Sequence, residues 1–576
     1  MQSGLFARAT DIHMMRLSIR RLLASSAILV AFSVAAGPAA AYLPEGRDFA
    51  ARAGSAASLT MADIANDPAA QALRSLLDTS NRDLAFLEKR DQAGIAEFYQ
   101  ERNYLPVWTE NGFLTPRAKA VMARIARADE DGLDPAAFTL PAPGLGERVA
   151  AAPSLVARLE LTLSRAVLAY ARQADGGRLD PRTLSRLMTP KAHYPDPIEV
   201  LTRVSSEPDG AAALASYNPQ HPAFLKLRQE LAAERAANAG IERPKPIPPG
   251  KAMKLGVRDP RVPLLRARLG IADPADPAEL DLYDDTLAEA VVAFQTEHGL
   301  AADGVVGAGT LGILNGATVD RVPLILANME RWRWLPRDLG RFHVFVNIPA
   351  FKLDVVKDGK VVHETRVVVG SPKNQSPIFS DEIEHIVVNP YWNVPASIAV
   401  KEMLPQIQAD PYYLTRRNYE VLVNVNGRMR SVDPGMIDWT SAAARSVRIR
   451  QIPGDDNALG DVKFLFPNEH SVYLHDTPSK SYFQRDMRAL SHGCIRVMNP
   501  FDFADVLVSE EPKISGERIR AMVGGREAWL NLAKHVPVHL TYFTAWVDDS
   551  GKLQTRPDIY GHDAKMIKAM GLESSG

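Results

Sequence analysis

The chain has 576 residues, of which 46% are hydrophobic and 23% are charged, and its 67 basic and 68 acidic side chains leave a formal net charge of −1. This composition is typical of ordinary folded domains, and the length is enough for about three of them. The charge balance lacks the basic excess that is usual in nucleic-acid-binding proteins, so we expect no nucleic-acid partner. Uncharged and zwitterionic partners stay open.

The N-terminal segment, residues 1–41, has the layout of a secretory signal peptide. Arginines precede an apolar run over residues 22–36, and the small residues 39–41 follow as a cleavage site. The apolar run is shorter than the roughly 20 residues that a helix needs to span a bilayer. We therefore expect export, with an uncleaved membrane anchor as the alternative, and a flexible lead-in over residues 42–83.

The next region, residues 84–241, shows helical periodicity. Its strongest helix carries apolar side chains at spacings of three and four and stops at a Gly-Gly pair: Leu155, Leu159, Leu163, Val167, Tyr170, Gly176 and Gly177. We predict a helical scaffold domain here. The segment 242–250 has four prolines in nine residues, which predicts a stiff, extended linker between domains.

A compact segment over residues 251–316 predicts a small helical module. Leu287, Val291, Phe294 and His298 share one helical face, Gly299 ends that helix, and Asp303–Gly304 turns the chain into a second short helix. A bridging helix is expected within residues 317–341.

Strand periodicity begins at Phe342 and extends to about residue 565, with a hairpin turn at Asp358–Gly359. One helical interruption, about 398–450, divides this β region, and an insertion of that length beside a site is commonly a functional cover. Residues 566–576 are expected to form a tail. The patterns together predict a multidomain α+β chain with a mainly β C-terminal domain.

Cys494 is the only cysteine, so no internal disulfide forms, and a buried inert thiol is one interpretation. The other interpretation is a nucleophile, which needs a base and oxyanion donors. Strand alternation places Tyr473 and His475 on one face, 21 and 19 residues before the thiol, and Gly493 allows a turn that exposes the sulfur. A single thiol gives no paired metal spacing, so we expect no metal and no cofactor.

The residues His475, a gap of fifteen residues and then Ser491-His492-Gly493-Cys494, followed by the hydrophobic Ile495, resemble the signature of the L,D-transpeptidase (YkuD-type) catalytic domain. Many members of this family have asparagine at the next position, where this chain has Arg496. The arginine resembles the large Gram-negative branch of the family, which has a capping insertion. Residues 251–316 resemble the three-helix peptidoglycan-binding module, and the match rests on these positions: Ala290, Val291, Phe294, Gln295, His298, Gly299, Leu300, Asp303, Gly304, Gly307 and Thr310.

The resemblance implies that Cys494 is the acyl-accepting nucleophile and His475 its base. A peptidoglycan tetrapeptide stem would lose D-Ala, leave a thioester on the sulfur, and be transferred to a second stem as a 3→3 cross-link. Ser491, His492 and Gly493 would shape the turn and the oxyanion site, with the backbone N–H groups of Gly493 and Cys494 as donors.

Four further residues are placed at the substrate site by the resemblance. Arg496 would hold a stem carboxylate, with a structural ion pair as the alternative, and Tyr473 would line the pocket unless it is a core tyrosine. Trp392 and Asn393 would form the rim, where packing is the other interpretation. Peptidoglycan would be the partner, together with other wall-synthesis proteins, in the periplasm, and carbapenems would acylate the cysteine.

Three alternatives stay open at this point. Water as acceptor would make the protein an L,D-carboxypeptidase, and a lipoprotein lysine would make it an anchoring transpeptidase. A non-catalytic wall-binding scaffold is the alternative of another class, and the presence of both Cys494 and His475 argues against it.

Overall fold

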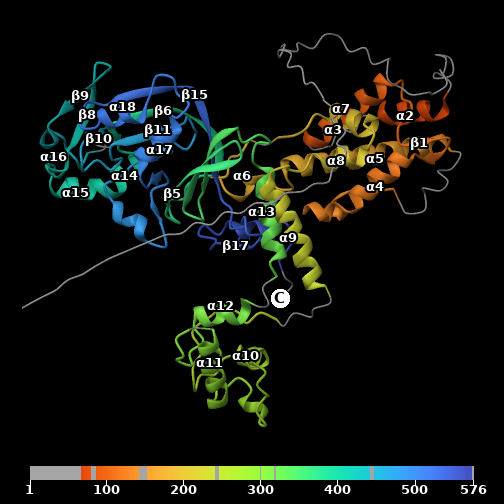
Figure 1. Cartoon of the computed structure of the whole chain (residues 1–576), viewed down its shortest axis with the longest axis horizontal. Helices are drawn as coiled ribbons and strands as arrows, with labels where there is room; N and C mark the ends of the chain where they lie inside the picture. The colour runs from red at the N-terminus through yellow and green to blue at the C-terminus, as the bar shows by residue number, and fades with distance from the viewer. Residues whose placement is uncertain are drawn as a thin grey trace, which may run out of the picture. The chain divides into compact units, whose positions relative to one another are not determined.

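The structure is a computed structural model that describes residues 67–78, 86–141, 152–191, 193–239, 245–298, 300–316, 320–441 and 447–573. The predicted signal peptide, residues 1–41, lies outside these ranges. Within them, no helix combines the length and the apolar character that crossing a membrane requires. The mixture of a helical N-terminal part and a mainly β C-terminal part confirms the predicted fold class (Figure 1).

The N-terminal part is a helical domain with a short hairpin. Its elements are α2 (Pro68–Asp78), α3 (Phe86–Glu101), β1 (Thr109–Glu110), β2 (Phe113–Leu114), α4 (Pro116–Ala126), η2 (Ala128–Asp131), η3 (Pro135–Ala137), α5 (Pro153–Gly176), α6 (Pro181–Leu184), α7 (Pro197–Ser206), α8 (Gly210–Ala215) and α9 (Pro222–Asn238). A proline opens several of these helices, and side chains such as Thr115 and Asp196 cap them. The long α5 is buried on most of its faces and forms the centre of the core.

The lead-in predicted over residues 42–83 differs from the structure in its described part, because residues 68–78 form α2. Asp67 caps this helix through Ala69 N–H at 2.7 Å, and Leu73 is fully buried in the core around α5. Leu73, Leu76 and Leu77 have the spacing of one helical face, but the helix is only 11 residues long and follows a long Ala- and Ser-rich segment without clear periodicity.

The small helical module contains α10 (Val262–Leu269), η4 (Pro277–Glu279), α11 (Asp285–Glu297) and α12 (Ala308–Gly316). Leu287 and Val291 of α11 are fully buried, and Phe294 stacks on His298 with ring centroids 4.1 Å apart. Ile247, in the segment predicted as linker, belongs to the module core and exchanges two hydrogen bonds with the side chain of Asn315. The module therefore begins before residue 251.

A single helix, α13 (Val322–Arg333), lies between the module and the first strand of the β domain in the chain. It is buried over most of its length. Its Glu330 side chain accepts hydrogen bonds from the backbone N–H groups of Arg178 and Leu179, at 2.5 and 2.9 Å.

The C-terminal domain is built on a nine-stranded sheet in the order β13-β5-β14-β12-β11-β6-β15-β3-β4, and it closes on itself because β4 also pairs with β5. Its strands are β3 (Phe342–Asn347), β4 (Lys352–Lys357), β5 (Lys360–Gly370), β6 (Phe379–Val388), β11 (Val462–Leu465), β12 (Leu474–His475), β13 (Ala489–Ser491), β14 (Ile495–Val497) and β15 (Ala528–Thr541). The predicted Asp358–Gly359 hairpin turn is confirmed between β4 and β5, with φ of 50° and 74°.

The closed sheet encloses one apolar core, to which α17 (Pro500–Leu507) and α18 (Gly516–Ala521) contribute. The remaining elements are η8 (Lys480–Gln484), β16 (Ala545–Val547), β17 (Leu553–Thr555) and α19 (His562–Ala569). The predicted tail, residues 566–576, differs from the structure, because Met566 of α19 is fully buried in this core. A short helix at a chain end has too few periodic positions to be recognised.

The insertion is helical only in its first half. That half contains α14 (Ala396–Ile398), η5 (Ala399–Met403), α15 (Leu404–Ala409) and α16 (Tyr413–Arg416). The second half contributes three strands, β8 (Tyr419–Val425), β9 (Arg428–Val432) and β10 (Arg448–Gln451), with η6 (Pro434–Met436) between β9 and β10. Together with β7 (Trp392–Asn393), which precedes the helices in the chain, they form a four-stranded sheet in the order β7-β10-β8-β9. In Figure 1 these strands lie together with α14, α15 and α16.

The prediction of a helical insertion is therefore wrong for residues 419–451. The segment Tyr419–Val425 alternates valines with polar residues, and Asn426–Gly427 has φ of 52° and 81°. Asn-Gly between two segments of alternating hydrophobicity is a strong signal for a β-hairpin, and the structure forms that hairpin between β8 and β9.

Candidate functional site

Three neighbouring strands place a row of polar side chains on one face of the closed sheet. Lys463 of β11 lies opposite His475 of β12, and His475 lies beside Arg496 of β14 in the parallel pairing. Residues that pair directly in a sheet point to the same face, so these three side chains form a row. Their neighbours Leu474 and Ile495 point to the other face and are buried in the core.

Cys494 lies in the turn between β13 and β14, which several hydrogen bonds hold in place. Gly493 has φ of 116°, a conformation that glycine adopts far more readily than other residues. The Gly493 carbonyl accepts from Ser376 Oγ at 2.7 Å, and its N–H donates to Ser491 Oγ at 3.2 Å. Ser491 Oγ in turn donates to the Cys494 carbonyl at 2.5 Å. The turn is thus fixed before and after the thiol.

Ser376 connects this turn to the C-terminal end of the domain. Its N–H donates to the hydroxyl oxygen of Tyr560 at 3.2 Å, and that hydroxyl donates to the Gly370 carbonyl at 2.5 Å. Tyr560 is itself buried. The position of the turn therefore depends on a residue 66 positions further along the chain than Cys494.

The Cys494 sulfur is half-buried next to Tyr473. Burial raises the pKa of the thiol to about 11, although a hydrogen bond from Tyr473 and the charge of Arg496 lower it. Tyr473 and His475 have ring centroids 5.6 Å apart. Among the residues that the structure describes, the side chain that hydrogen-bonds the sulfur is that of Tyr473. The His475 imidazole lies next to the Tyr473 ring and diagonally from the sulfur. The resting thiol is therefore protonated at neutral pH.

The His475 imidazole is buried and neutral. Its Nδ1 hydrogen-bonds the Asp476 carbonyl oxygen, which identifies Nδ1 as the protonated ring nitrogen. Burial and the nearby Arg496 guanidinium lower the His475 pKa to about 3, against the opposing effect of the carbonyl oxygens. The Asp476 carboxylate accepts from Lys480 Nζ and from Asp461 N–H, so it contacts neighbours other than the imidazole.

Arg496 lies in this row without a carboxylate partner. Its guanidinium carbon is 5.6 Å from the centroid of the Tyr482 ring, and its Nε is buried without a hydrogen bond. No ion pair of Arg496 exists within the described part of the chain. The structural ion pair considered as an alternative for this residue is thus not formed.

Trp392 and Asn393 belong to the insertion rather than to the closed sheet. They form β7, which pairs with β10, and the Trp392 ring centroid is 6.2 Å from that of Tyr419. The structure thus brings Cys494, Tyr473, His475 and Arg496 together and places Trp392 and Asn393 in a second sheet. They are half-buried and exposed, respectively.

Among the described residues, a polar pair connects the insertion to the cysteine turn. His492 Nε2 lies 2.8 Å from Glu402 Oε1, and Glu402 belongs to η5. Both side chains are about half exposed, at 44% and 51%. Sequence reasoning missed both Glu402 and Lys463, and the only signal for Lys463 is a single charged residue within an apolar strand.

Family models match three parts of this chain. Residues 341–512 match a model described as "L,D-transpeptidase catalytic domain", residues 258–314 one described as "Putative peptidoglycan binding domain", and residues 93–231 one described as "Scaffold domain". The chain contains an L,D-transpeptidase catalytic domain.

One curated protein and several solved structures are also similar to this chain. A Haemophilus influenzae protein named "Putative L,D-transpeptidase" is 38% identical over 242 residues, which are 42% of this chain and 48% of that protein. The chain thus spans about half the length of this curated relative.

Solved structures of L,D-transpeptidases are more distant. One from Mycobacterium smegmatis is 13% identical and covers 35% of this chain and 58% of its own, with a TM-score of 0.18. Another, from Xylanimonas cellulosilytica, is 16% identical and covers 51% and 98%, with a TM-score of 0.14.

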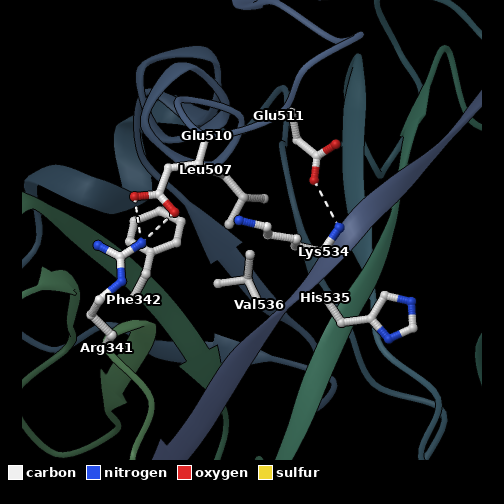
Figure 2. Close-up of a pocket in the computed structure, with 8 residues that line it drawn as sticks. All are labelled: Arg341, Phe342, Leu507, Glu510, Glu511, Lys534, His535 and Val536. Carbon is white, nitrogen blue, oxygen red and sulfur yellow. Dashed lines mark hydrogen bonds and ion pairs between the residues drawn. The ribbon is translucent and has the colours of Figure 1, made fainter. Parts of the chain in front are cut away.

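A second charged cluster of the L,D-transpeptidase domain lines a cavity of about 220 Å³ away from the row. Figure 2 shows that the Arg341 guanidinium faces the Glu510 carboxylate, with contacts of 2.6 and 2.5 Å. Lys357 Nζ is 2.9 Å from the same carboxylate, and Glu511 accepts from the backbone N–H of Lys534 at 3.1 Å. Both acidic side chains of this cavity are therefore already engaged.

Proposed function

We propose that the protein is a cell-wall L,D-transpeptidase that forms 3→3 peptidoglycan cross-links through a thioester on Cys494. The observation that carries the proposal is the placement of the only thiol on a fixed glycine turn, beside Tyr473 and diagonal to a neutral His475. The match of residues 341–512 to the catalytic domain supports the same chemistry.

The first half of the reaction begins with a protonated thiol, because burial raises the pKa of Cys494. The sulfur attacks the carbonyl carbon between the third stem residue and the terminal D-Ala while its proton passes to Nε2 of His475, the unprotonated ring nitrogen. Collapse of the tetrahedral intermediate breaks the C–N bond. D-Ala leaves with the proton that His475 returns, and the acyl group stays on sulfur.

The second half transfers the acyl group to an amine. A side-chain amine from the third residue of another stem attacks the thioester, its proton passes to His475, and the C–S bond breaks to restore the thiol. Each half develops an oxyanion. We assign its stabilisation to the Cys494 N–H, since the Gly493 N–H is engaged by Ser491 Oγ.

The remaining candidate residues have supporting roles in this proposal. Ser491 and Gly493 shape the turn, and His492 orients it through its contact with Glu402. Arg496, which has no carboxylate of its own, receives a stem carboxylate, and Tyr473 holds the sulfur before attack. Trp392 and Asn393 form the rim contributed by the insertion.

Peptidoglycan is the proposed substrate and partner, and residues 258–314 would bind it outside the cytoplasm. The periplasm is the proposed compartment, with residues 1–41 as the export signal. We expect Cys494-dependent activity in a periplasmic extract. This activity should disappear from the extract when residues 1–41 are deleted. Activity confined to the cytoplasmic fraction of intact cells would contradict it.

The decisive experiment uses the chain without residues 1–41 and purified muropeptides with tetrapeptide stems, followed by mass spectrometry. Cross-linked dimers that vanish in Cys494→Ala support transpeptidation, whereas tripeptides alone indicate the carboxypeptidase. Transfer only to a lipoprotein lysine indicates the anchoring enzyme. If the unaltered protein forms no product, the non-catalytic wall-binding scaffold is the remaining interpretation. A carbapenem adduct on Cys494, seen as a mass increase of the intact protein, is expected in parallel.

A further inference from the structure

Lys463 is a buried lysine on the same face as the cysteine and the imidazole. It pairs directly with His475 across β11 and β12, and its side chain is only 8% exposed. Its Nζ lies 6.0 Å from the ring centroid of Tyr473 and 5.6 Å from that of Trp529. The ammonium group is thus flanked by two aromatic rings, one of which contacts the thiol.

This ammonium group has no hydrogen-bond or ion-pair partner in the described ranges. The nearest acidic influence is Glu527, whose carboxylate accepts from the Tyr391 N–H at 2.9 Å and forms no ion pair with Lys463. The ammonium nitrogen itself is not among the fully enclosed side-chain atoms without a partner, so it keeps some contact with solvent and an anion can approach it.

Arg496 shows the same property on the other side of the imidazole. Its Nε is buried without a partner, and it pairs with His475 from β14 as Lys463 does from β11. Two cations without counter-ions therefore flank one imidazole in a single row. A substrate with two carboxylates would compensate both, whereas one carboxylate would leave a cation unpaired.

We propose that Lys463 is a second carboxylate receptor of the active site, which binds a carboxylate of the donor stem while Arg496 binds another. This proposal rests on the proposed function, because a donor stem supplies the carboxylates. Two sources fit the chemistry: the terminal D-Ala carboxylate and a side-chain carboxylate on the third stem residue. The two aromatic rings beside Lys463 leave the N–H donors of its ammonium group available. An anion that approaches along the sheet face can accept hydrogen bonds from them.

The first test is independent of turnover. The Cys494→Ala protein, labelled with ¹⁵N at histidine, is titrated with acetate while the His475 ring signals are followed by NMR. We expect a saturable shift, and a titration weakened about tenfold or more when Lys463→Met is added, since a charge-assisted hydrogen bond is lost. Lys534→Gln, which removes an exposed lysine of the second cluster, is the matched control. Titrations unaffected by Lys463→Met would overturn the proposal.

The second test identifies the carboxylate by steady-state kinetics of D-Ala release. Three tetrapeptide donors are compared: one unmodified, one with the third-residue side-chain carboxylate amidated, and one ending in D-alaninamide. We expect Lys463→Met to raise KM for the unmodified donor about 10-fold to 100-fold. That effect should disappear for the donor that lacks the carboxylate bound by Lys463. An equal rise for all three donors would overturn the proposal.

Two controls separate the possible failures. Lys463→Arg keeps the charge and should retain most of the affinity, and Lys463→Met should melt at the same or a higher temperature, because it removes a buried charge without a counter-ion. A merely structural lysine would show the opposite thermal effect. If the unaltered protein releases no D-Ala from any donor, the proposed function fails, and the acetate titration still decides the role of Lys463.

Discussion

Two clusters of cations in the C-terminal domain differ in whether a carboxylate neutralises them. In the cavity of Figure 2, Arg341 contacts the carboxylate of Glu510, and Lys357, which the figure does not draw, contacts the same carboxylate. On the face of β11, β12 and β14, Lys463 and Arg496 flank His475 without any carboxylate among the described residues. Both clusters hold at least two cations, so residue type alone does not distinguish a structural cluster from a proposed binding site. The presence or absence of the counter-charge does.

The two clusters also differ in exposure. Glu510 and Arg341 lie at the surface, where ion pairs contribute little to stability and water would solvate either partner alone. Lys463 is buried over most of its side chain, and the Nε of Arg496 is fully buried, where a missing counter-charge is costly. The predictions below change one cluster at a time, so that effects on activity and effects on folding can be assigned separately.

The largest effect is expected for the nucleophile. Cys494→Ala should reduce D-Ala release by at least about 10³-fold, because no other thiol can carry the acyl group. The measurement is single-turnover release with the unmodified donor, and Glu510→Gln in the other cluster should keep the activity of the unaltered protein. Residual release within tenfold of that activity would contradict the assignment.

The base comes next. His475→Gln should lower kcat by about 10² to 10⁴-fold with a small change in KM, since proton transfer is lost while substrate contacts remain. Steady-state kinetics with the same donor check this. An unchanged kcat would mean that another group takes the proton from sulfur.

The third prediction concerns pH. Burial and Arg496 lower the His475 pKa to about 3, so the acid limb of kcat/KM should lie far below the ordinary pKa of histidine, about 6.5. Removing a nearby positive charge makes the imidazolium less unfavourable, which raises the pKa. Arg496→Gln should therefore move the acid limb to higher pH, and Lys463→Met should move it less. Lys357→Gln, which removes a cation of the other cluster, should leave it in place.

A smaller effect is expected at the contact between the insertion and the turn. Glu402→Gln removes the charge that faces His492, in a pair that is about half exposed on both sides. Such pairs contribute less than about 1 kcal/mol, so kcat/KM should change by less than about fivefold. Kinetics at low and high salt provide the check. The difference between the variant and the unaltered protein should shrink as salt rises.

The smallest effect on activity belongs to the second cluster. Hydrogen bonds from Arg341 and Lys357 lower the pKa of Glu510 to about 2. Because the folded-state pKa is lowered, the stabilisation is present above the ordinary pKa of a glutamate and is lost as pH falls toward 2. Glu510→Gln should therefore melt slightly earlier at pH 7, with the difference vanishing in acid and with activity unchanged.

Much of the architecture was accessible from patterns in the sequence. The order of helical and β regions, the Asp358–Gly359 turn and the shared face of Tyr473 and His475 follow from local periodicity and turn chemistry. The helices α2 and α19 were missed because each is short and adjoins a segment without clear periodicity. The sheet of the insertion was missed because the whole segment was taken as helical, although Asn426–Gly427 indicated a hairpin.

The missing counter-charges could not be predicted in the same way. Whether Lys463 has a partner depends on β6, β12 and β15, which come from distant parts of the sequence and meet only in the folded sheet. The engagement of the Gly493 N–H by Ser491 likewise depends on the conformation of one turn. Spacing in the sequence pointed to the proposed nucleophile and the proposed base, but not to the charges around them.

The link from Tyr560 through Ser376 to Gly493 has a practical consequence for protein engineering. The catalytic match ends at residue 512, yet β15 is an inner strand of the closed sheet, and the Tyr560 hydroxyl supports the turn that carries the thiol. A fragment cut at the boundary of the family match would lose both. Protease nicking or a bulky fusion near residue 560 should therefore be detectable as altered alkylation kinetics of Cys494, far away in sequence from the modified position.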